Sequence, residues 1–317
     1  MLEIISTRTN EMIDPIMHVW GWEIPVYLFL GGFVAGMMII SGYFILSGRT
    51  RNTQCSCFII PIISIAAISL GMVALFLDLE HKLYFWRLYT TFQPDSPMSW
   101  GAWILLLVYP ILIANAIIRV PDWIGEKFEF LKKLSKQINE HEFGVKTIGA
   151  MSMIVGGVLG MYTGVLLSTM AARPAWNSAM LWVLFLVSGL STAAAFIHLI
   201  AADSEERKLL AKADNGFLIT ELLIIILMII GFVSSVEIHQ QAAALILGGP
   251  FTASFWVFVI ALGIVIPLII QLLAVNNKVQ HTPIAPIMVI AGGLILRFVI
   301  VGVGQYSHWP TAFFPNP

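Results

Sequence analysis

The chain has 317 residues, of which 58% are hydrophobic and only 11% are charged, and its formal net charge is −1. An ordinary soluble domain has about a quarter of its residues charged, because its surface must face water. The composition therefore predicts a protein whose surface faces lipid. It also excludes nucleic-acid binding, which requires a concentrated basic patch.

Residues 1–22 are predicted to form a tail outside the membrane, because their acidic side chains do not fit the order of a cleaved signal peptide. Eight apolar runs follow, each long enough to cross a hydrocarbon core of about 30 Å. The sequence therefore predicts an all-α polytopic membrane protein. The runs lie near 24–47, 55–79, 97–118, 147–170, 177–202, 216–239, 252–275 and 282–303.

The basic residues outside these runs predict the orientation, because cytoplasmic loops carry an excess of Lys and Arg. The face that carries both termini has four of them, Arg8, Lys82, Arg87 and Arg173, and the opposite face has twelve. Both termini are therefore expected outside, in the periplasm of a Gram-negative cell, with the protein in the bacterial inner membrane. The twelve are Arg49, Arg51, Arg119, Lys127, Lys132, Lys133, Lys136, Lys146, Arg207, Lys208, Lys212 and Lys278.

Between the third and fourth runs, residues 119–146 combine apolar side chains at helical spacing with three lysines. This pattern is typical of an amphipathic helix on the anionic inner leaflet. Docking of a cytoplasmic partner is the alternative interpretation. The apolar positions are Ile124, Phe128, Leu131, Leu134 and Ile138, and the lysines are Lys132, Lys133 and Lys136.

Polar side chains inside the spans are the strongest functional markers, because each charge there costs about 2.5–3.5 kcal/mol or more. Glu23, Tyr27, Asp78 and Tyr162 are expected near the outer surface, and Arg173 in the following outer loop. The outer side of the first four spans is therefore a candidate binding site. The ladder of Gly156, Gly160 and Gly164 around Tyr162 predicts close helix packing.

Further polar residues lie in the last four spans. His198 and Glu221 are predicted at similar depth on the inner side, where they form either an inner proton entry or a buried structural pair. Glu237 and Arg297 are predicted in the outer third, as an ion pair or as part of a proton path. Both interpretations stay open for each pair.

Metal and haem sites are not indicated. A bis-histidine haem needs two histidines at matching depth on different helices, and no such pair appears. Cys55 and Cys57 are too few for an iron–sulfur cluster, which needs about four thiols, and they are interpreted as small apolar residues. We therefore expect no haem or metal in this chain.

Several segments resemble the NrfD/PsrC family, which provides membrane subunits of polysulfide-reductase-type complexes. They are EIPVYLFLGGFVAG at 23–36, residues 78–86, SPMSWGAW at 96–103 and residues 162–177, which begin YTGVLL and end RPAWN. The resemblance covers residues 20–305 and is weaker after residue 216.

The resemblance implies two four-helix bundles, at 23–170 and 177–303, followed by an outer tail at 304–317. It implies a haem-free subunit that exchanges electrons between menaquinol or menaquinone and a four-cluster iron–sulfur subunit on the outer face, with a molybdopterin or multihaem catalytic subunit beyond it. The family's quinone-site tyrosine matches Tyr162, with Glu23, Tyr27, Asp78 and Arg173 around it. Glu23 and Tyr27 depart from the Asn and His pattern of the family, so the partner of each quinone oxygen stays open.

Two alternatives accompany this interpretation. The first is a proton-translocating or transporter-like subunit in which His198, Glu221, Glu237 and Arg297 form a path through the second bundle. The second is a structural anchor for partner subunits, which the costly polar residues of the outer side disfavour. The sequence does not distinguish among the terminal electron acceptors that such complexes use.

Overall fold

The computed structural model describes residues 20–49, 58–120, 126–170, 172–276 and 282–307, and these are all helices and their connections. Eight helical segments are long and apolar enough to cross a membrane, which confirms the predicted fold class. They are α1 (Glu23–Leu46), α2 (Ile59–Asp78), α4 (Pro97–Ile118), α7 (Glu142–Ser168), α8 (Met180–Ile200), α9 (Ser204–Val233), η4 (Ser254–Val265) continued by α11 (Ile266–Val275), and α12 (Ile284–Tyr306).

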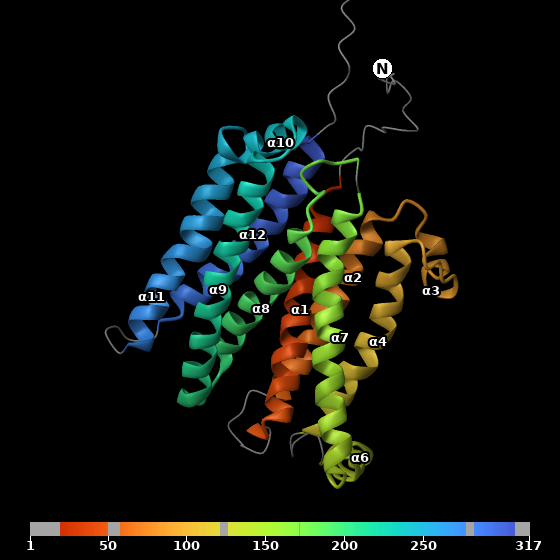
Figure 1. The fold of residues 1–317 in the computed structure, drawn as a ribbon. Helices are drawn as coiled ribbons and strands as arrows, with labels where there is room; N and C mark the ends of the chain where they lie inside the picture. Colours follow the sequence, from red (N-terminus) through yellow and green to blue (C-terminus); the bar gives the residue numbers. More distant parts are fainter. Residues whose placement is uncertain (1–19, 50–57, 121–125, 171, 277–281, 308–317) are drawn as a thin grey trace, which may run out of the picture.

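We group the spans, which Figure 1 shows, by their contacts into a first ring of α1, α2, α4 and α7 and a second ring of α8, α9, η4 with α11, and α12. That these form two separate bundles stays a prediction. In the first ring, α1 contacts α2 and α7, and α4 contacts the same two helices. In the second ring, α9 contacts α8 and α11, and α12 contacts the same two helices. The rings meet where α1 packs against α8 and α12 and where α7 packs against α8. The domain boundaries at 23–170 and 177–303 stay a prediction.

Both ends of the described chain lie at the same end of the molecule, where the Gln305 side chain donates to the Trp20 carbonyl at 3.1 Å. We call this the chain-end face, and the opposite end the α6 face, after the helix α6 (Glu129–Asn139) that lies there (Figure 1). Helix α10 (Glu237–Leu247) lies at the chain-end face. Which face is periplasmic stays a prediction.

Helix α6 confirms that the segment between the third and fourth spans is helical, and it packs against α4 and α7. Its last residues hold it in place, because the Asn139 amide donates to the Ile118 carbonyl at the end of α4 at 2.7 Å. Cys55, Cys57 and Ile124 lie outside the described residues. The loops between α2 and α4 include two short helices, η3 (Lys82–Tyr84) and α3 (Arg87–Thr90).

The predicted bounds of the sixth span were wrong. The sixth run was expected to begin near residue 216, but α9 begins at Ser204, with the Asp203 carboxylate capping it by accepting from the Glu205 N–H at 3.1 Å. The charged first turns are stable as helix because they carry an N-cap and acidic side chains near the N-terminus. Helix α9 also ends at Val233, so Glu237 belongs to α10 instead of the span.

Glycines bring the two rings into backbone contact. A Cβ on Gly189 of α8 would lie 2.8 Å from the Gly32 carbonyl carbon of α1, which is closer than real Cβ contacts. On α7, Gly164 faces the backbone of Trp182 in α8, and Gly156 faces the backbone of Ala35 within the first ring, which confirms the predicted packing role of this ladder. The junction between the rings therefore depends on the absence of side chains.

We expect Gly189→Ala to destabilise the protein by about 1–3 kcal/mol, because the added methyl group meets backbone that cannot rotate away. Thermal unfolding of the purified protein in detergent measures this. Gly157→Ala is the matched control, since its Cβ meets nothing within 4 Å. Equal unfolding temperatures for both variants would contradict the close contact.

Candidate functional site at the chain-end face

Two buried phenols face each other inside the first ring. Tyr27 of α1 is 4% exposed and Tyr162 of α7 is 5% exposed, and their side chains are close enough to interact electrostatically. The Tyr162 hydroxyl lies against the backbone of Gly101 in α4. It fits there because Gly101 has no side chain, since a Cβ at this position would overlap the Tyr162 phenol. The first ring thus holds two phenol hydroxyls in its interior.

Two carboxyl groups lie nearer the chain-end face than these phenols. Glu23 stands four residues before Tyr27, on the same side of α1, and Asp78 is the last residue of α2. The two carboxyl groups interact with each other electrostatically. Glu23 is half-buried and Asp78 is exposed. The structure therefore brings Glu23, Tyr27, Asp78 and Tyr162 to one region, from the surface inwards.

A cavity of about 510 Å³ is formed by the connection between α2 and α4, and Glu23, Tyr27, Asp78 and Tyr162 are not among its lining residues. Leu79, which follows Asp78, and Ser99, two residues before Gly101, both line it. The loop over it is held by Ser99, whose hydroxyl accepts from the Gln93 N–H at 3.1 Å. This volume is in the usual range of small-molecule sites. We call it the loop cavity.

Tyr89 of α3 is a site residue that the sequence interpretation missed. It interacts with Tyr27 and with Tyr109 of α4, and burial raises its pKa, with Tyr109 adding to the effect. The Tyr109 hydroxyl is 3.1 Å from the Ser69 hydroxyl of α2. The signal available in the sequence was Tyr109, a phenol in the middle of an apolar span. Together the four tyrosines form a row of phenols across the first ring.

Arg173, the fifth predicted residue, is placed against the second ring. Its guanidinium donates to the carbonyls of Gln305 and Ser307 at the end of α12, at 3.3 and 3.4 Å. Three residues later, the Trp176 indole donates to the Ile300 carbonyl at 2.8 Å. The same indole stacks on the Trp20 ring, with 5.1 Å between the ring centroids. The segment after α7 is therefore fixed to the last helix.

A second polar group is buried in the second ring. Arg297 of α12 is 1% exposed and donates to the Ser188 hydroxyl at 2.9 Å and to the Phe185 carbonyl at 3.0 Å. Glu221 of α9 interacts with Ser188 and with Arg297. The guanidinium also lies 4.2 Å above the Phe185 ring. Ser188 thus links Arg297 and Glu221, which also interact electrostatically inside the membrane.

Asp214 extends this group towards the α6 face and was assigned to a loop by the sequence interpretation. Its carboxylate accepts from the Ser191 hydroxyl and from the Gln271 amide, both at 2.6 Å. It also interacts with Glu221. The signal was the spacing of Glu206, Asp214 and Glu221, which places all three on one buried face of a helix.

Two predicted pairs are wrong. His198 stands ten residues beyond Ser188 on α8, about 15 Å along the helix, whereas Glu221 bonds at the level of Ser188. His198 instead lines a cavity of about 160 Å³ near the α6 face. Glu237 does not pair with Arg297, because it is exposed on α10, where it accepts from the Gln241 amide at 3.3 Å. Both errors follow from the wrong bounds of the sixth span.

Metal-binding groups are not found in the part of the protein that the structure describes: no three His, Cys, Asp or Glu side chains gather there. The groups that could hold a small molecule are phenols, carboxylates and backbone. Such groups bind and orient an organic ligand by hydrogen bonds and exchange protons with it.

The fold and the site define a class, a helical multi-pass membrane protein with buried phenols and a cavity towards one end of a four-helix ring. Residues 8–307 match the family described as polysulphide reductase, NrfD, and the chain belongs to this family. This confirms the resemblance found in the sequence.

Relatives of known name match over most of their lengths. The protein is 28% identical to a polysulfide reductase subunit of Wolinella succinogenes, over 90% of its own length and 94% of that relative. It is 28% identical to the NrfD homologue of Haemophilus influenzae, over 91% of its own length and 95% of that relative. It is 22% identical to a selenate reductase subunit of Mesobacillus selenatarsenatis, over 89% of its own length and 73% of that relative.

Proposed function

We propose that this protein is the membrane subunit of an anaerobic respiratory oxidoreductase and exchanges electrons between menaquinol or menaquinone and an iron–sulfur partner subunit. The observation that carries the proposal is the pair of buried, interacting phenols, Tyr27 and Tyr162, in the ring whose chain-end connection forms the loop cavity of about 510 Å³. Family membership and the similarity to subunits of a polysulfide reductase and a selenate reductase support it.

In this proposal the phenols and carboxyl groups have different roles. The Tyr162 hydroxyl, which the Gly101 backbone holds in place, donates a hydrogen bond to one oxygen of the quinone ring. Oxidation of quinol to quinone releases two electrons and two protons. The electrons leave to the partner subunit, and Glu23 and Asp78 accept the protons and pass them to water at the chain-end face. The reverse reaction uses the same groups.

The partner subunit is proposed to sit on the chain-end face above the loop cavity. The connection between α2 and α4 exposes Leu83 (86%), Tyr84 (54%), Phe85 (47%) and Trp86 (49%). Aromatic side chains are enriched in protein interfaces. A four-cluster iron–sulfur subunit here brings a cluster near the site, and a molybdopterin or multihaem catalytic subunit lies beyond it.

The experiment uses the complex purified with its native partners. Added menaquinol is expected to reduce the iron–sulfur clusters of the partner, as followed by electron paramagnetic resonance under anaerobic conditions. The control is the same partner subunits purified without this protein, which should stay oxidised. Equal reduction in both samples would show that quinol does not react through the membrane subunit.

We propose proton movement through the second ring as a second candidate function, because Arg297, Glu221 and Asp214 are all buried there and interact electrostatically. A structural ion pair needs only two of these three charges. The third charge, on Asp214, lies between this pair and the α6 face, and the hydrogen bonds it accepts from Ser191 and Gln271 come from neutral donors. His198 of α8 lies nearer still to the α6 face than Asp214.

Asp214→Asn tests this second function, since the amide keeps the size of the side chain but cannot carry the proton. In sealed vesicles containing the complex, we expect the membrane potential formed per quinol oxidised to fall by at least about half, with the quinol oxidation rate nearly unchanged. Glu205→Gln, on the exposed start of α9, is the control. An unchanged potential per quinol in Asp214→Asn would remove proton movement through this residue.

A further inference from the structure

A second large cavity lies at the opposite end of the first ring from the proposed quinone site. It has a volume of about 540 Å³ and is formed by the ends of α1 and α4 and the start of α7, with α6 beside it. Ser47, Arg119, Asn139 and Lys146 are part of its polar lining, and Ile45 and Ile118 are part of its apolar lining. Because three membrane-spanning helices begin or end there, the cavity lies at the level of the lipid headgroups.

The walls of this cavity are fixed by hydrogen bonds between helices. The Ile118 carbonyl accepts from the Asn139 amide at 2.7 Å and from the Ser135 hydroxyl at 3.3 Å, so two side chains of α6 hold the end of α4. On the other side, α1 ends in a turn through Gly48, whose φ of 72° suits glycine. The cavity is therefore a built feature of the fold.

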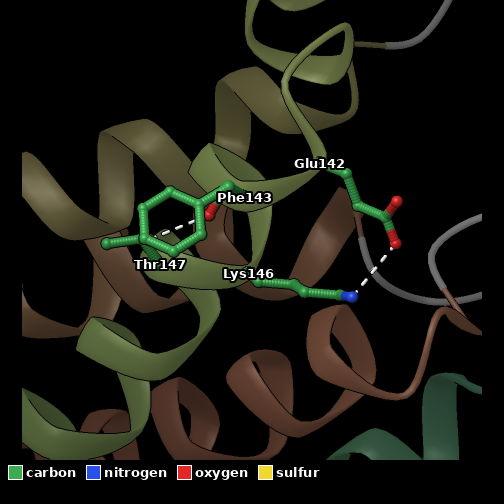
Figure 2. Close-up of polar contacts among 4 residues, drawn as sticks. All are labelled: Glu142, Phe143, Lys146 and Thr147. Carbon is green, nitrogen blue, oxygen red and sulfur yellow. Dashed lines mark hydrogen bonds and ion pairs between the residues drawn. The ribbon is translucent and has the colours of Figure 1, made fainter.

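The charge of the lining favours an anion. It contains two basic residues, Arg119 and Lys146, and one acidic residue, Glu142, which gives a formal charge of +1. Burial lowers the pKa of Arg119, but an arginine stays protonated at neutral pH. Lys146 extends along the first turns of α7 to Glu142, with 3.1 Å between Nζ and Oε1 (Figure 2). Both of these side chains are more than half exposed, so Lys146 can turn to a ligand.

We propose that this cavity binds the headgroup of an anionic phospholipid. The phosphate oxygens contact Arg119 and Lys146, and the start of an acyl chain lies along Ile45 and Ile118. Basic pockets between membrane helices bind such headgroups, and a fork of guanidinium N–H donors suits phosphate. This inference is independent of the proposed quinone chemistry.

The test is native mass spectrometry of the delipidated, intact complex titrated with dioleoylphosphatidylglycerol or dioleoylphosphatidylcholine, which share acyl chains and differ in headgroup charge. We expect a preference for phosphatidylglycerol. Arg119→Gln and Lys146→Gln should each weaken its binding about fivefold, the effect of one basic side chain near the surface. Lys133→Gln is the matched control, because it removes a charge from α6 outside the cavity lining.

A variant that is expected to strengthen binding separates the loss of a charge from simple misfolding, because a misfolded protein would bind less. Glu142→Gln should strengthen phosphatidylglycerol binding, by a similar factor, because it removes a negative charge and releases Lys146 from its ion pair. No preference in the native complex, or an equal loss in Lys133→Gln, would overturn the proposal. Displacement of the lipid by millimolar inorganic phosphate would also overturn it, by showing a site for a free anion.

Discussion

Tyr162→Phe is expected to lower the rate of menaquinol oxidation by the intact complex about tenfold or more. The change removes one hydroxyl and keeps the buried ring, so packing against α4 is retained. A hydrogen bond that holds the reacting oxygen contributes about 1–3 kcal/mol, and about 1.4 kcal/mol is tenfold in rate. Steady-state kinetics with menaquinol, giving kcat and KM separately, measure the effect.

Two further variants make this result specific. Tyr43→Phe removes a phenol from the exposed side of α1 and should leave the rate unchanged. Gly101→Ala alters the same site from α4, because its methyl group displaces the Tyr162 ring, and it should lower the rate at least as much. A normal rate in Tyr162→Phe, with the complex assembled, would remove Tyr162 from the site.

Arg297→Met should destabilise the protein by about 3–5 kcal/mol. The side chain is fully buried, and its loss leaves Glu221 as an uncompensated carboxyl group within the membrane. It also leaves the Phe185 carbonyl and the Ser188 hydroxyl without their donor. Thermal unfolding in detergent, together with the amount of protein recovered from membranes, measures the loss.

The double variant Arg297→Met with Glu221→Gln separates charge from packing. Replacing both members of a buried pair by neutral side chains is often close to neutral, whereas removing one member is not. We therefore expect the double variant to recover most of the lost stability. If it were as unstable as Arg297→Met alone, the loss would come from packing around α12 and not from the charge on Glu221.

The sequence predicts those parts of the fold that depend on hydropathy. The bounds of α4 agree with the predicted run at 97–118, because charged or polar residues flank it at both ends. Hydropathy failed at α9, where the helix continues into water through charged residues such as Glu205 and Lys208. In the first turns of α9, the helical spacing of the buried residues indicates the helix, whereas the mean hydropathy does not.

The site was predictable in depth but not in its partners. The rise of a helix gives the depth of Tyr27 and Tyr162 directly, and the structure brings them together. Partners depend on which faces of neighbouring helices meet, and this follows from packing across the whole protein. Arg297 therefore meets Glu221, which was expected elsewhere, and Tyr89 enters the site from a connection that hydropathy treats as a loop.

Helix α1 is the most enclosed span, with 78% of its apolar window buried, and its neighbours include both α2 and α12. During synthesis α1 enters the bilayer before α8 and α12. The glycine face of α1 that meets α8, and the Trp20 carbonyl that meets Gln305, therefore have no partners until the later helices have been inserted. A polypeptide released before α12 is made lacks these contacts with α12, so α1 stays partly uncovered in it.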